Sequence, residues 1–226
     1  MKILVTGSSR GIGKEIRDHF LKLGHQVLGI SRNQIDFEHE NYIHYPLDLS
    51  DLDAVELFCT KVKGVDVLIN SAAFVRANLF NLVTKDELVK TMNVNVISPF
   101  MLTQHLSKGM IKNQFGRIIN ISSIVTELDF KGEASYTISK AALEKMTEVA
   151  ALELAPFNIT INTLSISIFE SDLVKNLSLN QICDIKEKLV LKTPLNISDI
   201  LNAIDFYTDK RSAQITRQNL KFGGVI

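Results

Sequence analysis

A tyrosine and a lysine four residues apart form the most chemically suggestive pair in the sequence. Tyr136 and Lys140 lie in the segment Tyr-Thr-Ile-Ser-Lys. If this segment is helical, both side chains lie on one face, one turn apart. A phenol has a pKa of about 10 in water, and a neighbouring ammonium lowers that pKa toward the working pH by favouring the phenolate. The pair therefore predicts a tyrosine that donates and accepts a proton, although an inert surface pair would have the same spacing.

A glycine-rich segment near the N-terminus predicts a phosphate-binding loop. The apolar run Ile3-Leu4-Val5 leads into Thr-Gly-Ser-Ser-Arg-Gly-Ile-Gly, and a helical pattern follows. Glycine lets the backbone approach a pyrophosphate, and the free amides at the start of a helix favour an anion. A strand, a glycine turn and a helix in this order predict a dinucleotide site. Its expected contact residues are Gly7, Ser9, Arg10, Gly11, Ile12 and Gly13.

Two arginines bear on the choice of dinucleotide. The second expected strand ends at Ser31-Arg32, where an NAD-selective fold usually has an acidic residue that binds the ribose 2′-hydroxyl. Arg32, together with Arg10 of the glycine loop, could instead bind a 2′-phosphate through charge-assisted hydrogen bonds. The sequence therefore favours NADP(H) over NAD(H), unless both guanidinium groups are simply solvated surface charges.

The glycine spacing Gly-x-x-x-Gly-x-Gly after a threonine resembles the short-chain dehydrogenase/reductase family, and the resemblance extends over essentially the whole chain. In that family Tyr136 would be the proton donor and Lys140 its partner, both also contacting the cofactor. Ser123, the second serine of a pair, would hydrogen bond the substrate oxygen. Asn95 would hold a water that links the lysine to solvent. The resemblance thus implies a catalytic tetrad of Asn95, Ser123, Tyr136 and Lys140, in order behind the glycine loop.

Four further positions match cofactor-binding residues of the family. Asp48 matches an aspartate near the adenine ring, although it could equally cap a helix or belong to a turn. The segment Asn-Ser-Ala-Ala stands where the family commonly has Asn-Asn-Ala-Gly, so Asn70 and Ala72 agree while the glycine is lost. Ser171 occupies the position of a threonine that touches the nicotinamide carboxamide.

Other positions depart from the family pattern. Ile166 and Ser167 replace a Pro-Gly turn beside the nicotinamide, and Arg217 stands where the family often has glycine. Residues 171–194 would form the substrate lid. These differences put the identity of the substrate in doubt more than the type of reaction.

Short β-rich runs alternate with helical patterns along the chain. The expected strands are Lys2–Thr6, Gln26–Ser31, Tyr42–Tyr45, Val65–Asn70, Arg117–Ser122, Ile159–Leu164 and Leu220–Phe222. Helical patterns cover Asp51–Lys63, Thr84–Asn113 with a distortion at Pro99, and Glu133–Ala155. This alternation predicts one α/β domain over residues 1–226, of the doubly wound Rossmann type. It would have a mostly parallel seven-stranded sheet with helices on both faces.

Composition excludes several other classes of protein. Of the 226 residues 46% are hydrophobic, and 25 basic residues balance 25 acidic ones, which favours neither a nucleic-acid nor a membrane partner. Cys59 and Cys183 fit neither a disulfide framework nor a zinc site, the five histidines lack metal-ligand spacing, and we expect no metal. The apolar run after Met1 is too short for a signal peptide, so we expect a soluble, cytoplasmic protein.

The sequence therefore predicts an NADPH-dependent oxidoreductase that reduces a carbonyl to an alcohol. The resemblance implies a 3-oxoacyl thioester or similar ketone, either free or bound to an acyl carrier, and a homotetramer with a dimer as the alternative. A different class also remains open. The altered Pro-Gly segment would suit a non-catalytic NADP(H) sensor on the same fold.

Overall fold

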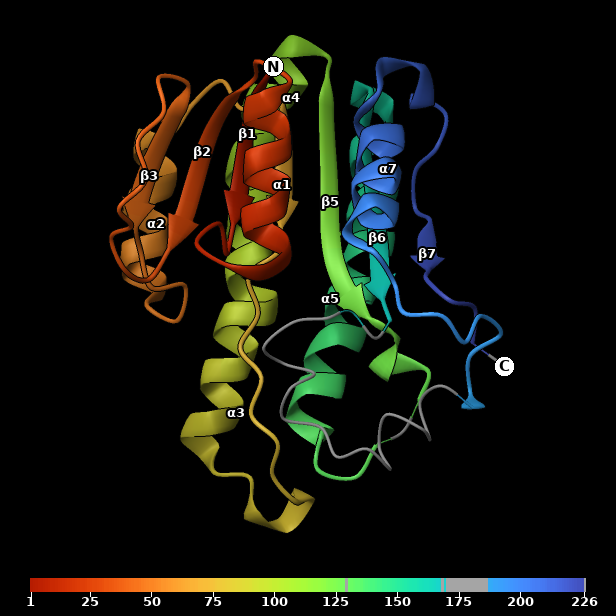
Figure 1. Ribbon diagram of the computed structural model, residues 1–226. Helices are drawn as coiled ribbons and strands as arrows, with labels where there is room; N and C mark the ends of the chain where they lie inside the picture. The colour runs from red at the N-terminus through yellow and green to blue at the C-terminus, as the bar shows by residue number, and fades with distance from the viewer. Residues whose placement is uncertain (129, 168, 170–186, 226) are drawn as a thin grey trace.

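Seven strands form one sheet in the order β3-β2-β1-β4-β5-β6-β7, and all six strand pairs are parallel (Figure 1). The computed structural model describes residues 1–128, 130–167, 169 and 187–225. The strands are β1 Lys2–Thr6, β2 Gln26–Ser31, β3 Tyr42–Pro46, β4 Val67–Asn70, β5 Gly116–Ser123, β6 Ile159–Ile166 and β7 Asn219–Lys221. The strand order reverses between β1 and β4, which is where an open parallel sheet binds its ligand. The predicted fold class is confirmed.

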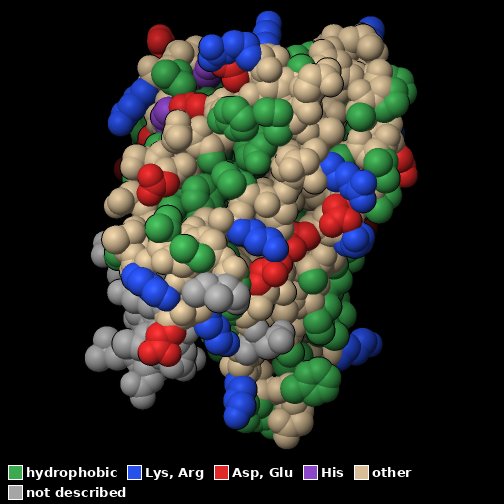
Figure 2. Space-filling view, turned by 90° about the vertical axis from the view of Figure 1, so that its right-hand side faces the viewer, with side chains coloured by type: hydrophobic (Ala, Val, Ile, Leu, Met, Phe, Trp, Pro, Cys, Tyr) green, Lys and Arg blue, Asp and Glu red, His purple; other side chains and the backbone are tan. Residues whose placement is uncertain are grey.

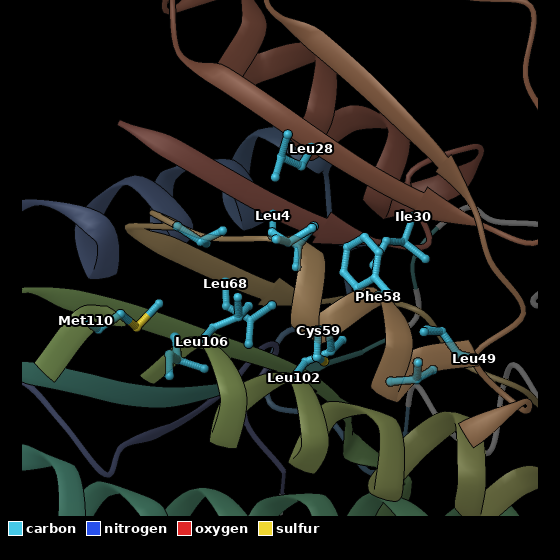
Figure 3. Close-up of a cluster of buried hydrophobic side chains, with 14 of the residues drawn as sticks. Leu4, Leu28, Ile30, Leu49, Phe58, Cys59, Leu68, Leu102, Leu106 and Met110 are labelled. Atoms are coloured by element: carbon cyan, nitrogen blue, oxygen red, sulfur yellow. The ribbon is translucent and has the colours of Figure 1, made fainter. Parts of the chain in front are cut away.

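Helices cover both faces of the sheet (Figure 1). Helices α1 (Gly11–Lys22) and α7 (Ile197–Thr208) pack on one face, and α2 (Leu52–Lys61), α4 (Ser98–Asn113) and α5 (Ala134–Leu154) pack on the other. Successive side chains of a strand point to opposite faces, so Leu4 joins the α2–α4 side (Figure 3) while Ile3 and Val5 join the α1–α7 side. Burial on both faces explains the continuous apolar runs in the sequence.

The helical region predicted over Thr84–Asn113 consists of two helices joined by a π-helical turn. Helix α3 spans Lys85–Met92, the turn spans Asn93–Ile97, and α4 follows. Pro99 lies at the beginning of α4, so the distortion precedes it. Proline has no N–H to donate to the carbonyl four residues earlier, which is that of Asn95, and this accounts for a wider turn there.

Strand β6 runs two residues further than its apolar pattern predicts. Ile166 pairs in register with Ser123 of β5. A proline at this position would remove a backbone donor and end the ladder, whereas isoleucine lets the strand continue. The replacement of the family's Pro-Gly turn thus lengthens the strand beside the cleft.

The described part of the chain contains no helix long and apolar enough to cross a bilayer. Within the same residues, no cluster of three or more His, Cys, Asp or Glu side chains could hold a metal ion.

Candidate active site

A cleft of about 620 Å³ opens at the carboxyl ends of β1, β4 and β5. This volume lies in the range usual for small-molecule sites. The glycine loop after β1 forms one wall, and the end of β5 and the first turns of α5 form another. The sequence-predicted residues that line the cleft are Gly7, Ser9, Arg10, Gly11, Ile12, Gly13, Arg32, Asp48, Ala72, Ser123, Tyr136 and Lys140.

The glycine loop has a backbone path that side chains would obstruct. Gly7 has φ +73°, and its N–H donates to the carbonyl of Ile30 at 2.8 Å. A Cβ on Gly13 would lie 2.4 Å from the carbonyl oxygen of Gly7. Helix α1 begins at Gly11, and no side chain caps it. Its first amides are therefore free to bind an anion at the cleft.

Thr6 joins the glycine loop to the loop after β4. Its Oγ1 accepts the backbone N–H groups of Ser71 and Ala72, both at 3.0 Å. A Cβ on Gly7 would lie 3.0 Å from the Cα of Ala72. The two loops that flank the switch point of the sheet therefore lie in direct contact.

Charged groups gather at the adenosine end expected for a dinucleotide. Arg10 and Arg32 are both exposed and both line the cleft. The carboxylate of Asp48 accepts the N–H and the hydroxyl of Ser50, at 2.9 and 2.8 Å. Burial alone would raise the pKa of Asp48, but these hydrogen bonds and the charges of Lys90 and Arg32 bring it below its ordinary value. Asp48 is therefore ionised near Lys90 and Arg32. It forms a turn with Ser50 and also lines the cleft.

Asn70 lies beneath the cleft and braces the sheet. It is buried, and its Nδ2 donates to Oδ1 of Asn120 at 2.8 Å. Asn120 in turn donates to Oγ1 of Thr147 on α5, also at 2.8 Å. The chain of side-chain hydrogen bonds connects β4, β5 and α5, while Ser71, Ala72 and Ala73 form the cleft wall at this point.

Lys140 is buried at the floor of the cleft. Only 2% of the residue is exposed, and its Nζ donates to the carbonyl of Ile121 at 2.7 Å. Nζ lies 5.6 Å from the centroid of the Tyr136 ring, so the spacing of four does place the two side chains together. Burial lowers the pKa of Lys140 to about 8, against the opposing attraction of Glu144.

Tyr136 lies half-buried one turn earlier on α5. Burial raises the pKa of its phenol, the hydrogen bond with Ser123 lowers it, and the negative charge of Glu133 raises it again. The net direction of the Tyr136 pKa is upward, opposite to the lowering expected from Lys140, because burial outweighs the hydrogen bond with Ser123. The phenol is thus protonated at neutral pH in the protein alone, and it lies within hydrogen-bond reach of the second serine of β5.

Asn95 lies in the π-helical turn and is 1% exposed. Its Oδ1 accepts the N–H of Phe74 at 2.7 Å, and its Nδ2 donates to the Phe74 carbonyl and to Oγ of Ser139, both at 2.9 Å. Ser139 donates in turn to the carbonyl of Tyr136 at 2.7 Å. The Asn95 side chain therefore fixes the loop after β4 against the first turn of α5.

Part of the predicted site lies outside the described residues, and one residue beside the cleft was not predicted. Ser171 lies outside the described residues, and of the expected lid at 171–194 only residues 187–194 are described. Glu144, which we did not single out from the sequence, lies within hydrogen-bond distance of three hydroxyl groups beside the cleft. Its signal was available, because it continues the four-residue spacing of Tyr136 and Lys140.

These features fit a dinucleotide cofactor. The glycine positions keep the backbone open to a pyrophosphate, the start of α1 supplies free amides, and the cleft continues to Ser123, Tyr136 and Lys140. The same arrangement can bring a carbonyl oxygen to a serine hydroxyl and a protonated phenol.

Comparison with known proteins agrees with this geometry. The short chain dehydrogenase family model matches residues 1–182. The 3-oxoacyl-[acyl-carrier-protein] reductase FabG of Buchnera aphidicola subsp. Schizaphis graminum is 31% identical and that of Escherichia coli (strain K12) 29%, each covering 98% of this chain and 95% of its own length. A 4-hydroxyisoleucine dehydrogenase complexed with NADH superposes with a TM-score of 0.89 at 25% identity, over 99% of this chain and 97% of its own. The chain is therefore an oxidoreductase that belongs to the short-chain dehydrogenase/reductase family.

Proposed function

We propose that this protein is an NADPH-dependent reductase that converts a carbonyl to an alcohol, its substrate being a 3-oxoacyl thioester or a similar ketone. The observation that carries the proposal is the position of Tyr136. Its protonated phenol, the hydroxyl of Ser123 and the buried ammonium of Lys140 converge on one end of the cleft. That combination suits protonation of a carbonyl oxygen as the carbonyl carbon is reduced.

Each of these side chains has a distinct role in the proposal. A nicotinamide cofactor, when bound, supplies the hydride. The Ser123 hydroxyl donates a hydrogen bond that positions and polarises the carbonyl oxygen. Tyr136 gives its proton to that oxygen as the negative charge develops, and the Lys140 ammonium stabilises the phenolate that results. Asn95 keeps the first turn of α5 in place through Ser139.

The preference for NADPH rests on charge at the adenosine end. Arg10 and Arg32 are exposed cations in the cleft wall, and Ser31 replaces the acidic residue that would select NADH. Arginine suits a 2′-phosphate because its guanidinium can donate two parallel hydrogen bonds. The similar 4-hydroxyisoleucine dehydrogenase was solved with NADH, so NAD(H) is the alternative that the test must exclude.

The substrate class rests on the relatives and on the lining of the cleft. The curated relatives are named for 3-oxoacyl groups on an acyl carrier protein. Apolar side chains line the cleft near Tyr136, namely Val75, Ile124, Val125, Phe130 and Phe169. They suit an acyl chain, whether the substrate is a free small molecule or is bound to a carrier.

We also infer a cytoplasmic homotetramer, with a dimer as the alternative. Exposed apolar residues support self-association, because large apolar patches mark contact surfaces. Phe100 of α4 and Val149 and Leu152 of α5 are about half exposed. Apolar side chains also gather on the face beside β7 (Figure 2). Phe206 of α7 and Leu220 of β7 are among the exposed apolar residues.

A carbonyl panel tests the proposed function. The purified protein would be mixed with NADPH or NADH and with 3-oxoacyl thioesters of several lengths, simple ketones and sugar ketones, and loss of reduced nicotinamide would be followed by absorbance. We expect turnover of at least one carbonyl, faster with NADPH. Binding of NADPH without turnover of any carbonyl would favour the non-catalytic sensor.

A further inference from the structure

Glu144 lies one helical turn beyond Lys140 on the same face of α5, outside the predicted tetrad. Its Oε1 accepts the hydroxyl of Ser122 at 2.6 Å and lies 3.0 and 3.1 Å from the hydroxyl oxygens of Ser165 and Thr126. These two hydroxyls also have Asn219 Oδ1 and the Ser123 carbonyl within reach, at 2.7 and 3.1 Å. Ser122 is the last residue but one of β5, Ser165 is its partner in register on β6, and Thr126 belongs to the 3-10 turn that follows β5. One carboxylate therefore holds three separate segments together.

These three segments surround the substrate-binding serine. Ser122 precedes Ser123 directly, and the Oγ1 of Thr126 lies 3.1 Å from the Ser123 carbonyl oxygen. Ser122 and Ser165 are almost completely buried, at 2% and 0% exposure. Buried hydroxyls need an acceptor, and Ser122 has Glu144 as its acceptor. Fixing Ser122 therefore fixes the strand end that carries Ser123, which lines the cleft together with Tyr136.

The same carboxylate acts on Lys140 through space. Burial disfavours the Lys140 ammonium, and Glu144 is the charged group that opposes this. Two uncharged groups also lie near Nζ: β5 provides the Ile121 carbonyl, and Tyr136 presents its ring. On the far side of Tyr136, Glu133 faces the phenol. Glu144 is thus placed to keep Lys140 protonated where the solvent cannot.

We propose that Glu144 is a positioning residue of the active site, which keeps Lys140 in its ammonium form and fixes the end of β5 so that Ser123 meets Tyr136. The catalytic part of this inference rests on the proposed function. Glu144 itself touches neither the cleft residues that would hold the cofactor nor the carbonyl. Its effect is transmitted through Lys140 and through the two neighbours of Ser123.

The charge part is tested with Glu144→Gln, which keeps the side-chain volume and an accepting oxygen but removes the charge. The titration of Lys140 would be followed by NMR of its Cε and Nζ, with Lys140→Met serving to assign the signals. We expect the Lys140 midpoint to fall by at least one pH unit. Glu148→Gln is the matched control, because Glu148 lies one turn further on α5, is 39% exposed, and pairs with Lys145 and Arg217. It should leave the midpoint unchanged.

The catalytic part is tested on the best carbonyl of the panel. In Glu144→Gln the Lys140 ammonium loses its proton at lower pH than in the wild type. For a one-unit shift of the Lys140 midpoint, kcat should be about fivefold below the wild-type value at pH ~8 and nearly equal to it at pH ~6. Glu144→Asp retains the charge and should recover most of the activity at the higher pH. Thermal melting followed by circular dichroism verifies that each variant is folded, and Glu144→Met, which also removes the charge at similar volume, replaces glutamine if the latter is not.

An identical Lys140 midpoint in the wild type and in Glu144→Gln overturns the inference. So does an equal loss of kcat at both pH values, which would indicate a purely structural residue. A wild-type protein that reduces no carbonyl would instead refute the proposed function, and the NMR titration would still decide whether Glu144 controls Lys140.

Discussion

Gly13 faces the backbone of Gly7 so closely that a Cβ on Gly13 would lie 2.4 Å from the carbonyl oxygen of Gly7 and 2.8 Å from its carbonyl carbon. Gly7 directly follows β1 and Gly13 lies in the first turn of α1, so this contact sets how closely the helix approaches the strand. The anion-binding amides of the helix depend on it.

Replacing Gly13 with alanine should therefore impair cofactor binding strongly. The new methyl group would force the first turn of α1 away from Gly7 and move the free amides. We expect the affinity for NADPH, measured by titration calorimetry, to fall at least tenfold, or about 1.4 kcal/mol. Gly109→Ala is the control, because a Cβ there meets nothing within 4 Å in the middle of α4, and it should bind NADPH normally. Equal affinities for the two variants would contradict the prediction.

Cofactor preference should depend on Arg32. If Arg10 and Arg32 grip a 2′-phosphate, NADPH binds at least tenfold more tightly than NADH, a difference of about 1.4 kcal/mol. Arg32→Asp places a carboxylate where it repels the phosphate and can accept a ribose hydroxyl, so the preference should disappear or invert. Arg211→Asp, an exposed arginine in the 3-10 turn after α7, controls for the change in net charge. Equal affinities of the unmodified protein for both cofactors would refute the 2′-phosphate hypothesis.

Tyr136→Phe should separate catalysis from binding. The substitution removes one hydroxyl and keeps the ring, so turnover should fall by about 10²–10⁴-fold or more, because no neighbour can deliver the proton as directly. Affinity for NADPH should change by less than about 1 kcal/mol, since the glycine loop and the arginines lie elsewhere. Tyr207→Phe alters a buried tyrosine of α7 on the opposite face of the sheet, and it should retain full turnover. Wild-type activity in Tyr136→Phe would eliminate the proposed mechanism.

Local spacing was enough to predict the fold class and part of the cleft lining. The glycine loop and the pair Tyr136 and Lys140 depend on short sequence patterns whose geometry is set by helix and strand periodicity. The pKa of Tyr136 was not predictable in this way, because its direction depends on how deeply the phenol is buried. Glu144 was not predicted from the sequence for a related reason. Its importance comes from hydroxyls of β5 and β6 that only the folded sheet brings to it.

Strand and helix ends were the least predictable part of the fold. Strand β6 continues to Ile166 because a neighbouring strand accepts its pairing, which an apolar pattern does not reveal. The turn at Asn93–Ile97 likewise depends on Pro99 further along the chain. By contrast, the position where the family often has glycine was informative, since Arg217 there adopts φ +62°.

Arg217→Gly should stabilise the protein. A side chain in the left-handed region costs about 1–2 kcal/mol, and the glycine variant loses only a 3.9 Å contact with exposed Glu148, together with some entropy of the unfolded chain. We expect the free energy of unfolding in urea to rise by about 0.5–1 kcal/mol. Arg211→Gly, within the 3-10 turn Lys210–Ser212, should instead lower the free energy of unfolding. A loss of stability in Arg217→Gly would mean that its side-chain contacts outweigh the backbone strain.

Lys140→Met should increase stability while abolishing turnover. The pKa of Lys140 is lowered by burial from 10.5 to about 8, even with Glu144 opposing the change, so the folded protein binds this proton less well than the unfolded chain does. The difference of about 2.5 units corresponds to roughly 3 kcal/mol of destabilisation at neutral pH. In the variant the Ile121 carbonyl loses its hydrogen-bond donor, which offsets part of this gain. We expect a net stabilisation of about 1–2 kcal/mol at pH ~7.

The stability difference between Lys140→Met and the wild type should shrink as the pH rises above ~8. Below pH ~8 Lys140 is charged in both states and its burial cost is present in full. Between pH ~8 and ~10.5 the folded protein loses the proton first, so wild-type stability rises and the advantage of Lys140→Met shrinks. Urea unfolding at several pH values measures this difference, and Lys145→Met, an exposed lysine on the same helix with 71% side-chain exposure, should show no such trend. If the stability advantage of Lys140→Met stayed constant or grew above pH ~8, burial of the charged Lys140 side chain would not be what destabilises the wild type.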